Sequence, residues 1–128
     1  MLLKIQFENE TPIYEQLRNQ IIMGIAKGEL KEGESMPSVR QLAADLGINL
    51  HTVNKTYNLL KNEGFLVVHR RKSVIVNTLE AINQIDISEK LDQVLSPLVA
   101  EAICRGLGTD DLSQIVKRIY SNITKETK

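Results

Sequence analysis

The chain has 128 residues, of which 42% are hydrophobic and 25% are charged, and its 16 basic and 16 acidic side chains give no net charge. This length allows one compact domain, or one small domain with an appendage, and the composition is that of an ordinary folded protein. The absence of Trp and the low aromatic content of 4% argue against a β-sandwich core and against an aromatic stacking platform for nucleic acid.

The N-terminus and the cysteine content indicate a cytoplasmic protein. The first residues, MLLKIQ, lack the basic run and the long apolar stretch of a signal peptide. No segment of the sequence approaches the roughly 18 apolar residues that a membrane helix needs. The single cysteine, Cys104, excludes an internal disulfide and suits a reducing compartment. We expect its side chain to be buried as a small apolar group.

Positive charge is concentrated in the middle of the chain. Residues 36–78 contain six basic and two acidic side chains, whereas the segments before and after each carry two more acidic than basic ones. A local excess of this kind is what contact with DNA phosphates requires. An excess of four charges is also common on solvated surfaces, so the distribution supports a nucleic-acid partner only weakly.

The first predicted helix begins at Thr11 and Pro12, because Thr can cap free N–H groups and Pro is well tolerated at the first helical position. Gly28 is expected to end this helix, and residues 30–36 are expected to form a connecting loop. The helix carries one apolar stripe, formed by Ile13, Leu17, Ile21, Ile22 and Ile25.

The next segment predicts two helices joined by a tight turn. The second helix begins at Pro37 and Ser38 and ends at Gly47, and the third is capped by Asn49 and closed by Gly64. This arrangement is typical of a helix-turn-helix, although periodicity alone favours an ordinary αα-hairpin equally. The positions expected to face inward are Val39, Leu42, Ala43, Leu46, Val53, Leu60 and Tyr57, the last with its hydroxyl at the surface.

After Gly64 the hydrophobic period changes to that of strands. Residues 65–68 and 74–76 are two short β-prone runs, and the five residues between them include three consecutive cations. A hairpin with a basic tip directly after a helix-turn-helix predicts the wing of a winged helix. The alternative is an exposed hairpin whose charged turn only keeps it soluble.

From about residue 77 the pattern is helical again. Pro97 should kink or split the first long helix, in which case Ser96 is a candidate cap. Glycines at positions 106 and 108 break the helix, and Thr109 is expected to cap the last one.

The two C-terminal helices cannot bury all their apolar surface against each other. We therefore expect a mainly α fold with a small β-hairpin wing, in which residues 1–78 form a winged helix-turn-helix DNA-binding domain and residues 79–128 a helical dimerisation module. Packing of these helices back onto the N-terminal domain is the alternative. The residues expected at the dimer contact are Leu91, Leu95, Leu98, Ile103, Leu112, Ile115 and Ile119.

Short motifs between residues 10 and 78 follow the spacing of one known family. They are PIYEQL from Pro12, GIAKGEL from Gly24, MPSVRQLA from Met36, LGIN from Leu46 and TVNKTY from Thr52. In register and without gaps, this stretch resembles the DNA-binding domain of the gluconate-repressor (GntR) family, and the short helical remainder resembles its YtrA subfamily. The resemblance implies a homodimer that binds DNA through a winged helix, usually as a repressor, and commonly at a transporter operon.

The sequence departs from the family pattern at the reading positions and in the wing. Family members often carry basic residues at the positions of Leu50 and Asn54, so their absence implies a different operator or weaker direct readout. Family wings usually have glycines at the tip, whereas this chain has none between Gly64 and Gly106. This implies a wing that relies more on charge, for which arginine suits a narrow minor groove.

The third helix should lie in the major groove with its N-terminal residues at the base edges. Asn54 is suited to pairing with adenine, and Leu50 to contact with a thymine methyl. Arg40 matches the family position whose guanidinium contacts DNA, with a salt bridge to Asp45 or Glu63 as the alternative. The full set of DNA-binding candidates is Ser38, Arg40, Asn49, Leu50, His51, Thr52, Asn54, Lys55, Arg70, Arg71 and Lys72.

No pattern in the sequence indicates catalysis or a cofactor. His51, His69 and Cys104 are too few and too scattered for a zinc site, and no nucleophile–base pair or Gly-rich phosphate loop is present. We expect no metal, no cofactor and no enzymatic activity.

The sequence thus predicts a sequence-specific DNA-binding transcription regulator. We expect a homodimeric repressor of a nearby operon, with a transporter operon as the candidate target, bound to a roughly two-fold symmetric double-stranded operator. One alternative is an effector-sensing activator, although no effector is indicated. Another is a protein-interaction adaptor that uses the winged helix, but the polar and basic reading face favours DNA.

Overall fold

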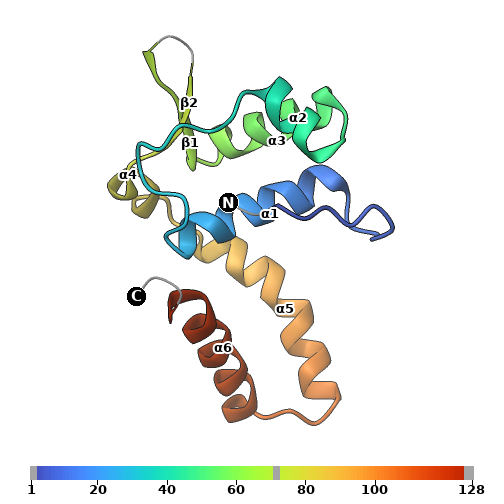
Figure 1. Cartoon of the computed structure of the whole chain (residues 1–128). Coiled ribbons are helices and arrows are strands. Elements are labelled where there is room, and N and C mark those ends of the chain that lie inside the picture. Colours follow the sequence, from blue (N-terminus) through green and yellow to red (C-terminus); the bar gives the residue numbers. More distant parts are fainter. Residues whose placement is uncertain (1–2, 71–72, 126–128) are drawn as a thin grey trace.

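The computed structural model describes residues 3–70 and 73–125. Three helices and a β-hairpin form the N-terminal part, and α5 and α6 extend from it as two arms (Figure 1). The elements in chain order are α1 (Ile13–Ala26), α2 (Val39–Leu46), α3 (Leu50–Asn62), β1 (Leu66–Val68), β2 (Val74–Val76), α4 (Leu79–Asn83), α5 (Ser88–Cys104) and α6 (Thr109–Thr124). The predicted mainly α fold with a β-hairpin wing is confirmed.

The caps of α2 and α3 are those predicted. The Ser38 hydroxyl accepts a hydrogen bond of 3.0 Å from the backbone N–H of Gln41, and the Asn49 side chain accepts one of 2.7 Å from that of His51. Gly47 ends α2 with φ +66°, in the left-handed region that glycine adopts at little cost. Because each signal acts within a few residues, the turn between the two helices is set locally.

Two other predicted helix starts were wrong. In α1 the capping position is Pro12 rather than Thr11, and no side chain caps the helix. In α6 it is Gly108 rather than Thr109, and the Asp111 carboxylate accepts a hydrogen bond of 2.8 Å from the Gly108 N–H. An acidic side chain three residues into the helix therefore satisfies the N–H of the capping residue, and no side chain of the described residues caps the N–H groups of the first turn.

Pro97 does not split the penultimate helix. α5 runs without a break from Ser88 to Cys104, so Ser96 lies inside the helix instead of capping a second one. Its hydroxyl donates a hydrogen bond to the carbonyl of Asp92, one turn earlier. Proline removes one backbone donor from the helix, and the hydrogen bonds on either side keep the helical path.

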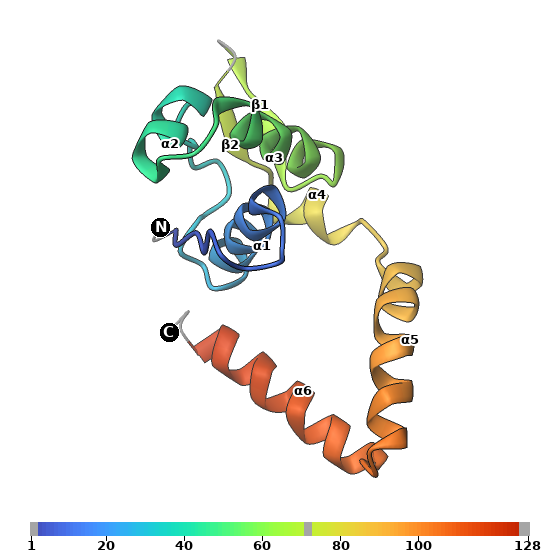
Figure 2. The same cartoon turned by 90° about the vertical axis from the view of Figure 1, so that its right-hand side faces the viewer.

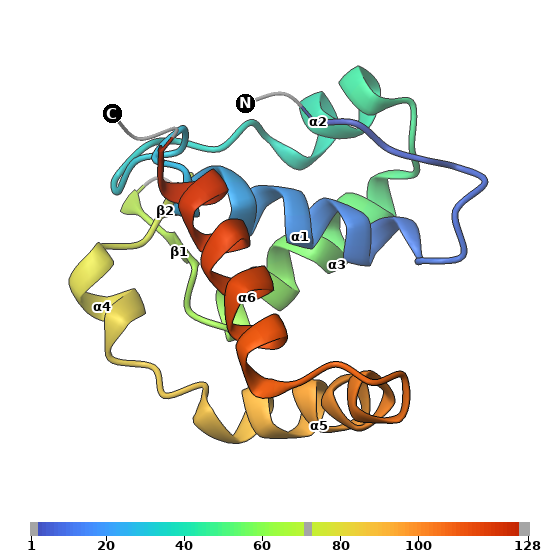
Figure 3. The same cartoon turned by 90° about the horizontal axis from the view of Figure 1, so that it is seen from below.

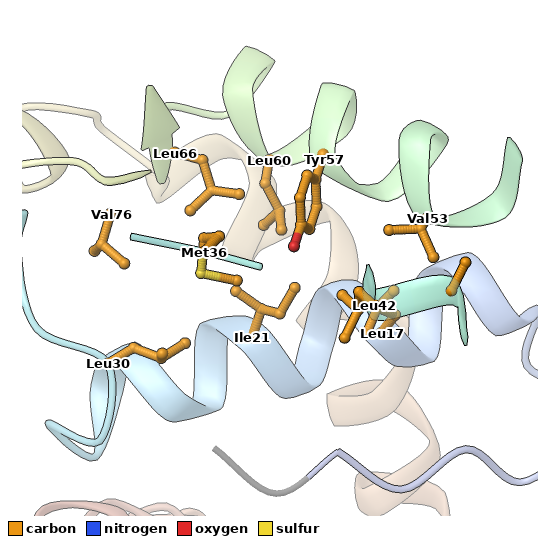
Figure 4. Close-up of a cluster of buried hydrophobic side chains, with 11 residues drawn as sticks. Leu17, Ile21, Leu30, Met36, Leu42, Val53, Tyr57, Leu60, Leu66 and Val76 are labelled. Carbon is orange, nitrogen blue, oxygen red and sulfur yellow. The ribbon is translucent and has the colours of Figure 1, made fainter. Parts of the chain in front are cut away.

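The buried core joins α1, α2, α3 and the hairpin. Leu17 and Ile21 of α1 lie fully buried against the inner face of α3 (Figure 4). The remaining buried apolar residues are Leu30, Met36, Leu42, Ala43, Val53, Tyr57, Leu60, Leu66 and Val76. All of them lie between residues 17 and 76, and α4, α5 and α6 contribute no buried residue.

The segment predicted as a plain connecting loop, residues 30–36, instead pairs with the hairpin. The N–H of Gly33 donates to the carbonyl of Val76 at 2.8 Å, and the N–H of Met36 donates to the carbonyl of Val74 at the same distance. Ser35 forms an isolated antiparallel bridge with Ile75. β2 therefore has β1 on one side, in the register Leu66–Val76, and this segment on the other. The base of the wing is thereby tied to the helical core.

The C-terminal helices contribute no buried residue to this core and touch it only at its edge. Seen from the side, α5 and α6 diverge from the glycine-containing loop that joins them (Figure 2). Seen from below, α6 crosses back over α1 (Figure 3), and the two helices touch there. No helix in the described part of the chain is long and apolar enough to cross a membrane.

The Tyr57 hydroxyl is inside the protein, not at the surface as predicted. It donates a hydrogen bond of 2.7 Å to the carbonyl of Pro37, directly before α2, and burial raises the pKa of Tyr57. This bond fixes α3 against the start of α2. The hydroxyl is therefore engaged inside the protein and does not face a DNA phosphate.

Replacing Tyr57 with Phe should lower the free energy of unfolding by about 1 kcal/mol, because the partly buried hydrogen bond to the carbonyl of Pro37 is lost. Urea unfolding at fixed protein concentration measures this loss. Tyr120→Phe is the matched control, since Tyr120 is 70% exposed on α6 and should unfold as the wild type does. Equal stability of the two variants would contradict the structural role of this bond.

Candidate nucleic-acid interface

One face of α3 is buried and the opposite face is exposed. Val53, Thr56, Tyr57 and Leu60 point into the protein, as the helical period requires. Thr56 was not among the predicted core positions, and its hydroxyl donates to the carbonyls of Tyr14 and Thr52. The exposed side chains between positions 50 and 58 are those of Leu50, His51, Asn54, Lys55 and Asn58, with Thr52 half-buried beside them.

The structure thus gathers the predicted α3 candidates on one surface. Asn58, which the sequence reading did not single out, lies one turn beyond Asn54 on the same exposed face. Its helical spacing from His51 and Asn54 could have revealed it. Asn49 is exposed as well, but its side-chain oxygen is engaged in capping α3. Its position at the tip of the helix leaves only its amide N–H groups to meet a ligand.

Arg40 is exposed in the first turn of α2. The alternative of a salt bridge to Asp45 or Glu63 was wrong, because Gln41 donates to Asp45 and Arg18 pairs with Glu63. Among residues 3–70 and 73–125, Arg40 makes no ion pair. Its guanidinium therefore keeps its full charge for an external anion. Ser38, exposed at the start of the same helix, is engaged as the cap.

Lys55 has an aromatic partner rather than an acidic one. Its ammonium nitrogen lies 3.8 Å from the centroid of the Tyr14 ring, on the first turn of α1. A lysine over an aromatic face is held by the ring quadrupole and keeps its charge. The contact joins residues far apart in sequence, so no local pattern could have indicated it.

The tip of the wing carries the cation Arg70. The hairpin closes with a hydrogen bond of 2.7 Å from the N–H of His69 to the carbonyl of Ser73, and Arg70 follows His69 with its side chain exposed. The other two predicted wing contacts, Arg71 and Lys72, lie outside the described residues.

A charged cluster lies at the other end of α3. The Arg18 guanidinium pairs with the Glu63 carboxylate through two hydrogen bonds of 2.8 and 2.9 Å, and the ammonium of Lys90 on α5 lies 3.6 Å from the same carboxylate. The hydrogen bonds from Arg18, with the positive charges of Arg18 and Lys90, hold the pKa of Glu63 below its usual range. The cluster links α1, the end of α3 and α5, and it borders a cavity of about 640 Å³ lined also by Phe65 and Val94.

The residues predicted for dimerisation all lie on α5 and α6. All are exposed in the single chain except Leu112, which is half-buried. Cys104, expected to be buried, is exposed at the end of α5, because its neighbours on that helix also face solvent. Within the described residues no group of three or more His, Cys, Asp or Glu could hold a metal ion.

Three features occur together in the described residues: an exposed polar face on α3, an arginine without an ion pair on α2, and a hairpin with a cation at its tip. They define a winged helix-turn-helix transcription regulator that binds DNA. The chain belongs to the family of bacterial regulatory proteins named the gntR family, whose model matches residues 13–76. The resemblance to the YtrA type is confirmed along nearly the whole chain.

One relative is the HTH-type transcriptional repressor YtrA of Bacillus subtilis (strain 168), which is 31% identical over 127 residues and 95% of each chain. Among solved structures, YtrA from Sulfolobus acidocaldarius, a GntR-family transcription factor, is 42% identical, with a TM-score of 0.66 over 78% of this chain and 99% of that one. A structure from Listeria monocytogenes EGD-e described as a transcriptional antiterminator has a TM-score of 0.82 over 96% of this chain and 92% of that one. At 23% identity, this last similarity shows the fold alone.

Replacing Arg40 with Ala should weaken DNA binding and lower the slope of log affinity against log salt concentration by about 0.9, the value of one phosphate contact. Fluorescence anisotropy with a labelled duplex, titrated at several salt concentrations, measures both quantities. Lys117→Ala, an exposed cation on α6, is the control and should change neither. An unchanged affinity and slope for Arg40→Ala would reject its role.

Replacing Glu63 with Gln should lower the free energy of unfolding at neutral pH by about 1 kcal/mol, since the charge that attracts Arg18 and Lys90 is lost. A carboxyl with a lowered pKa stabilises the fold above its unfolded pKa, and that contribution disappears as pH falls through the folded pKa. The gap between wild type and variant should therefore close on acidification. Urea unfolding at successive pH values tests this.

The control for this series is Glu101→Gln, because Glu101 forms an exposed pair with Arg105 within α5. Its unfolding should follow the wild type at every pH. A gap for Glu63→Gln that stays constant down to acid pH would show that the lost stability does not come from the charge.

Proposed function

We propose that this chain is a homodimeric, sequence-specific repressor that binds a roughly two-fold symmetric operator. Each copy would place the N-terminal half of α3 in a major groove and its wing beside the groove. The half-site centres would then lie about 10 bp apart or at a multiple of that distance, so that both reading helices meet the same side of the duplex.

The uncovered apolar surface of the C-terminal arms is the observation that carries the dimer. In the single chain Leu98 is 59% exposed, Ile103 64% and Val116 62%. Apolar surface in water costs about 25 cal/mol per Å², so a helix pair with this pattern is stabilised by a partner that covers it. A second copy offers the same surface, and a two-fold arrangement lets each copy cover the other.

The distribution of buried residues supports a boundary between a DNA-binding part and a dimerisation part at about residue 78. The buried residues lie between Leu17 and Val76, so residues 1–78 contain a complete core of their own. Residues 79–128 contribute no buried residue among those described, as expected of a module that is completed by association.

Repression is the mode that best fits a chain of this kind. The YtrA relative is named a repressor, and this chain covers 95% of its length. A dimer with two reading helices can block transcription by occupying its operator, without a further domain. By the same resemblance, a nearby operon that encodes a transporter is the candidate target.

The dimer can be tested with Leu95→Asp. Leu95 is exposed on α5, so the substitution should leave the single chain folded but place two charges in the contact. Sedimentation velocity should show the mass of two chains for the wild type and of one chain for the variant, whose affinity for a labelled duplex should also fall.

Phe7→Asp is the matched control, because Phe7 is also apolar and exposed but lies in the N-terminal segment. It should sediment as the wild type does. A wild-type chain that remains a monomer at micromolar concentration, or a Leu95→Asp variant that remains a dimer, would contradict the proposal.

A further inference from the structure

Lys55 lies on the side of α3 that faces α1, not at the centre of the exposed face. Its neighbour Thr56 marks this side, because the Thr56 hydroxyl donates a hydrogen bond of 3.1 Å to the backbone carbonyl of Tyr14. Successive residues of a helix are rotated by about 100°. Lys55 therefore lies at the border between the α1 contact and the exposed face that contains His51 and Asn58.

The Tyr14 ring holds the lysine at this border. The ring is half-buried in the first turn of α1, whereas the Lys55 side chain is exposed and its ammonium nitrogen lies 3.8 Å from the ring centroid. A free lysine side chain samples many rotamers and loses that freedom on binding. The contact with the Tyr14 ring restricts these rotamers before DNA binds, so less side-chain entropy is lost on binding.

The contact keeps the ammonium available to an anion. In the described part of the chain no carboxylate forms an ion pair with Lys55. An ion pair would neutralise the charge, but an aromatic face does not. The ammonium also keeps three N–H donors, of which the ring can face only some. A DNA phosphate can therefore bind it without first displacing a competing anion.

From this geometry we infer that Tyr14 is a positioning residue for DNA binding. Its ring holds Lys55 at the α1 edge of α3, where the ammonium contacts a backbone phosphate at the rim of the major groove. The bases are left to Leu50, His51 and Asn54. The helix α1, which contributes no predicted DNA contact, thus takes part in docking. The inference rests on α3 being the element that meets DNA.

Four variants test it: Tyr14→Phe, Tyr14→Leu, Lys55→Gln and the double variant Tyr14→Leu/Lys55→Gln. Binding to a fluorescein-labelled duplex of mixed sequence is measured by anisotropy at several salt concentrations, because a phosphate contact needs no particular operator. Lys55→Gln should weaken binding and lower the salt slope by about 0.9. Tyr14→Leu should weaken it about two- to fivefold, the range of an exposed cation–π contact.

The remaining variants separate positioning from other roles. Tyr14→Phe should bind as the wild type does, because the ring is retained. In the double variant, Tyr14→Leu should add nothing to the effect of Lys55→Gln. Tyr120→Leu, an exposed tyrosine on α6, is the control and should not change binding.

Three results would overturn the inference. They are an unchanged affinity for Tyr14→Leu, an equal loss in the presence and absence of Lys55, and a loss in Tyr14→Phe as large as in Tyr14→Leu. Failure of the wild type to bind any duplex at low salt would instead contradict the DNA-binding function itself.

If Tyr14→Leu folds poorly, an NMR measurement without DNA still tests the inference. The ring should shift the NMR signals of the Lys55 side-chain methylene protons upfield in the wild type and in Tyr14→Phe. Unshifted Lys55 signals in the wild type would overturn the inference irrespective of any variant.

Discussion

The packing of α3 against α1 and α2 is the constraint on which the DNA-binding surface depends. A helix of 13 residues can present a fixed set of side chains to DNA only if its rotation about its own axis is fixed. The rotation is fixed by the burial of Val53, Tyr57 and Leu60, and the hydrogen bond from the Tyr57 hydroxyl to the carbonyl of Pro37 ties the helix to the start of α2. The same packing determines that His51 and Asn54 are exposed.

The wing and the charged cluster at Glu63 extend this constraint to the two ends of the helix. The hairpin follows α3 directly, and its second strand is paired on both sides, by β1 and by the segment that leads into α2. At the same end, Glu63 joins α3 to α1 and to α5 through Arg18 and Lys90. One carboxylate thus connects α5 with the end of α3.

The sequence predicted those features that depend on a few neighbouring residues. Ser38, Gly47 and Asn49 cap or end their helices within one turn, and the runs on either side of the wing tip are rich in β-branched residues, which favour strands. The family motifs coincide with these scaffold positions. The grouping of the candidate α3 side chains on one exposed face was predictable in the same way, because spacing along a helix determines which side chains share a face.

What the sequence did not predict depends on contacts between distant segments or on particular local hydrogen bonds. The pairing of Met36 with Val74, the hydroxyl bond of Tyr57 and the ring contact of Lys55 all join residues far apart in the chain. The start of α6 was misjudged because the Asp111 carboxylate accepts a hydrogen bond from the N–H of Gly108, which makes Gly108 rather than Thr109 the capping position. The integrity of α5 at Pro97 depends on neighbouring hydrogen bonds that a proline rule alone does not include.

The central claim is that two copies of this chain read DNA together through their α3 helices. A selection of bound fragments from a pool of genomic DNA, followed by sequencing, tests it most directly. The account predicts one enriched motif with two-fold symmetry and half-site centres about 10 bp apart or at a multiple of that distance. An asymmetric motif, or no enriched motif, would contradict it.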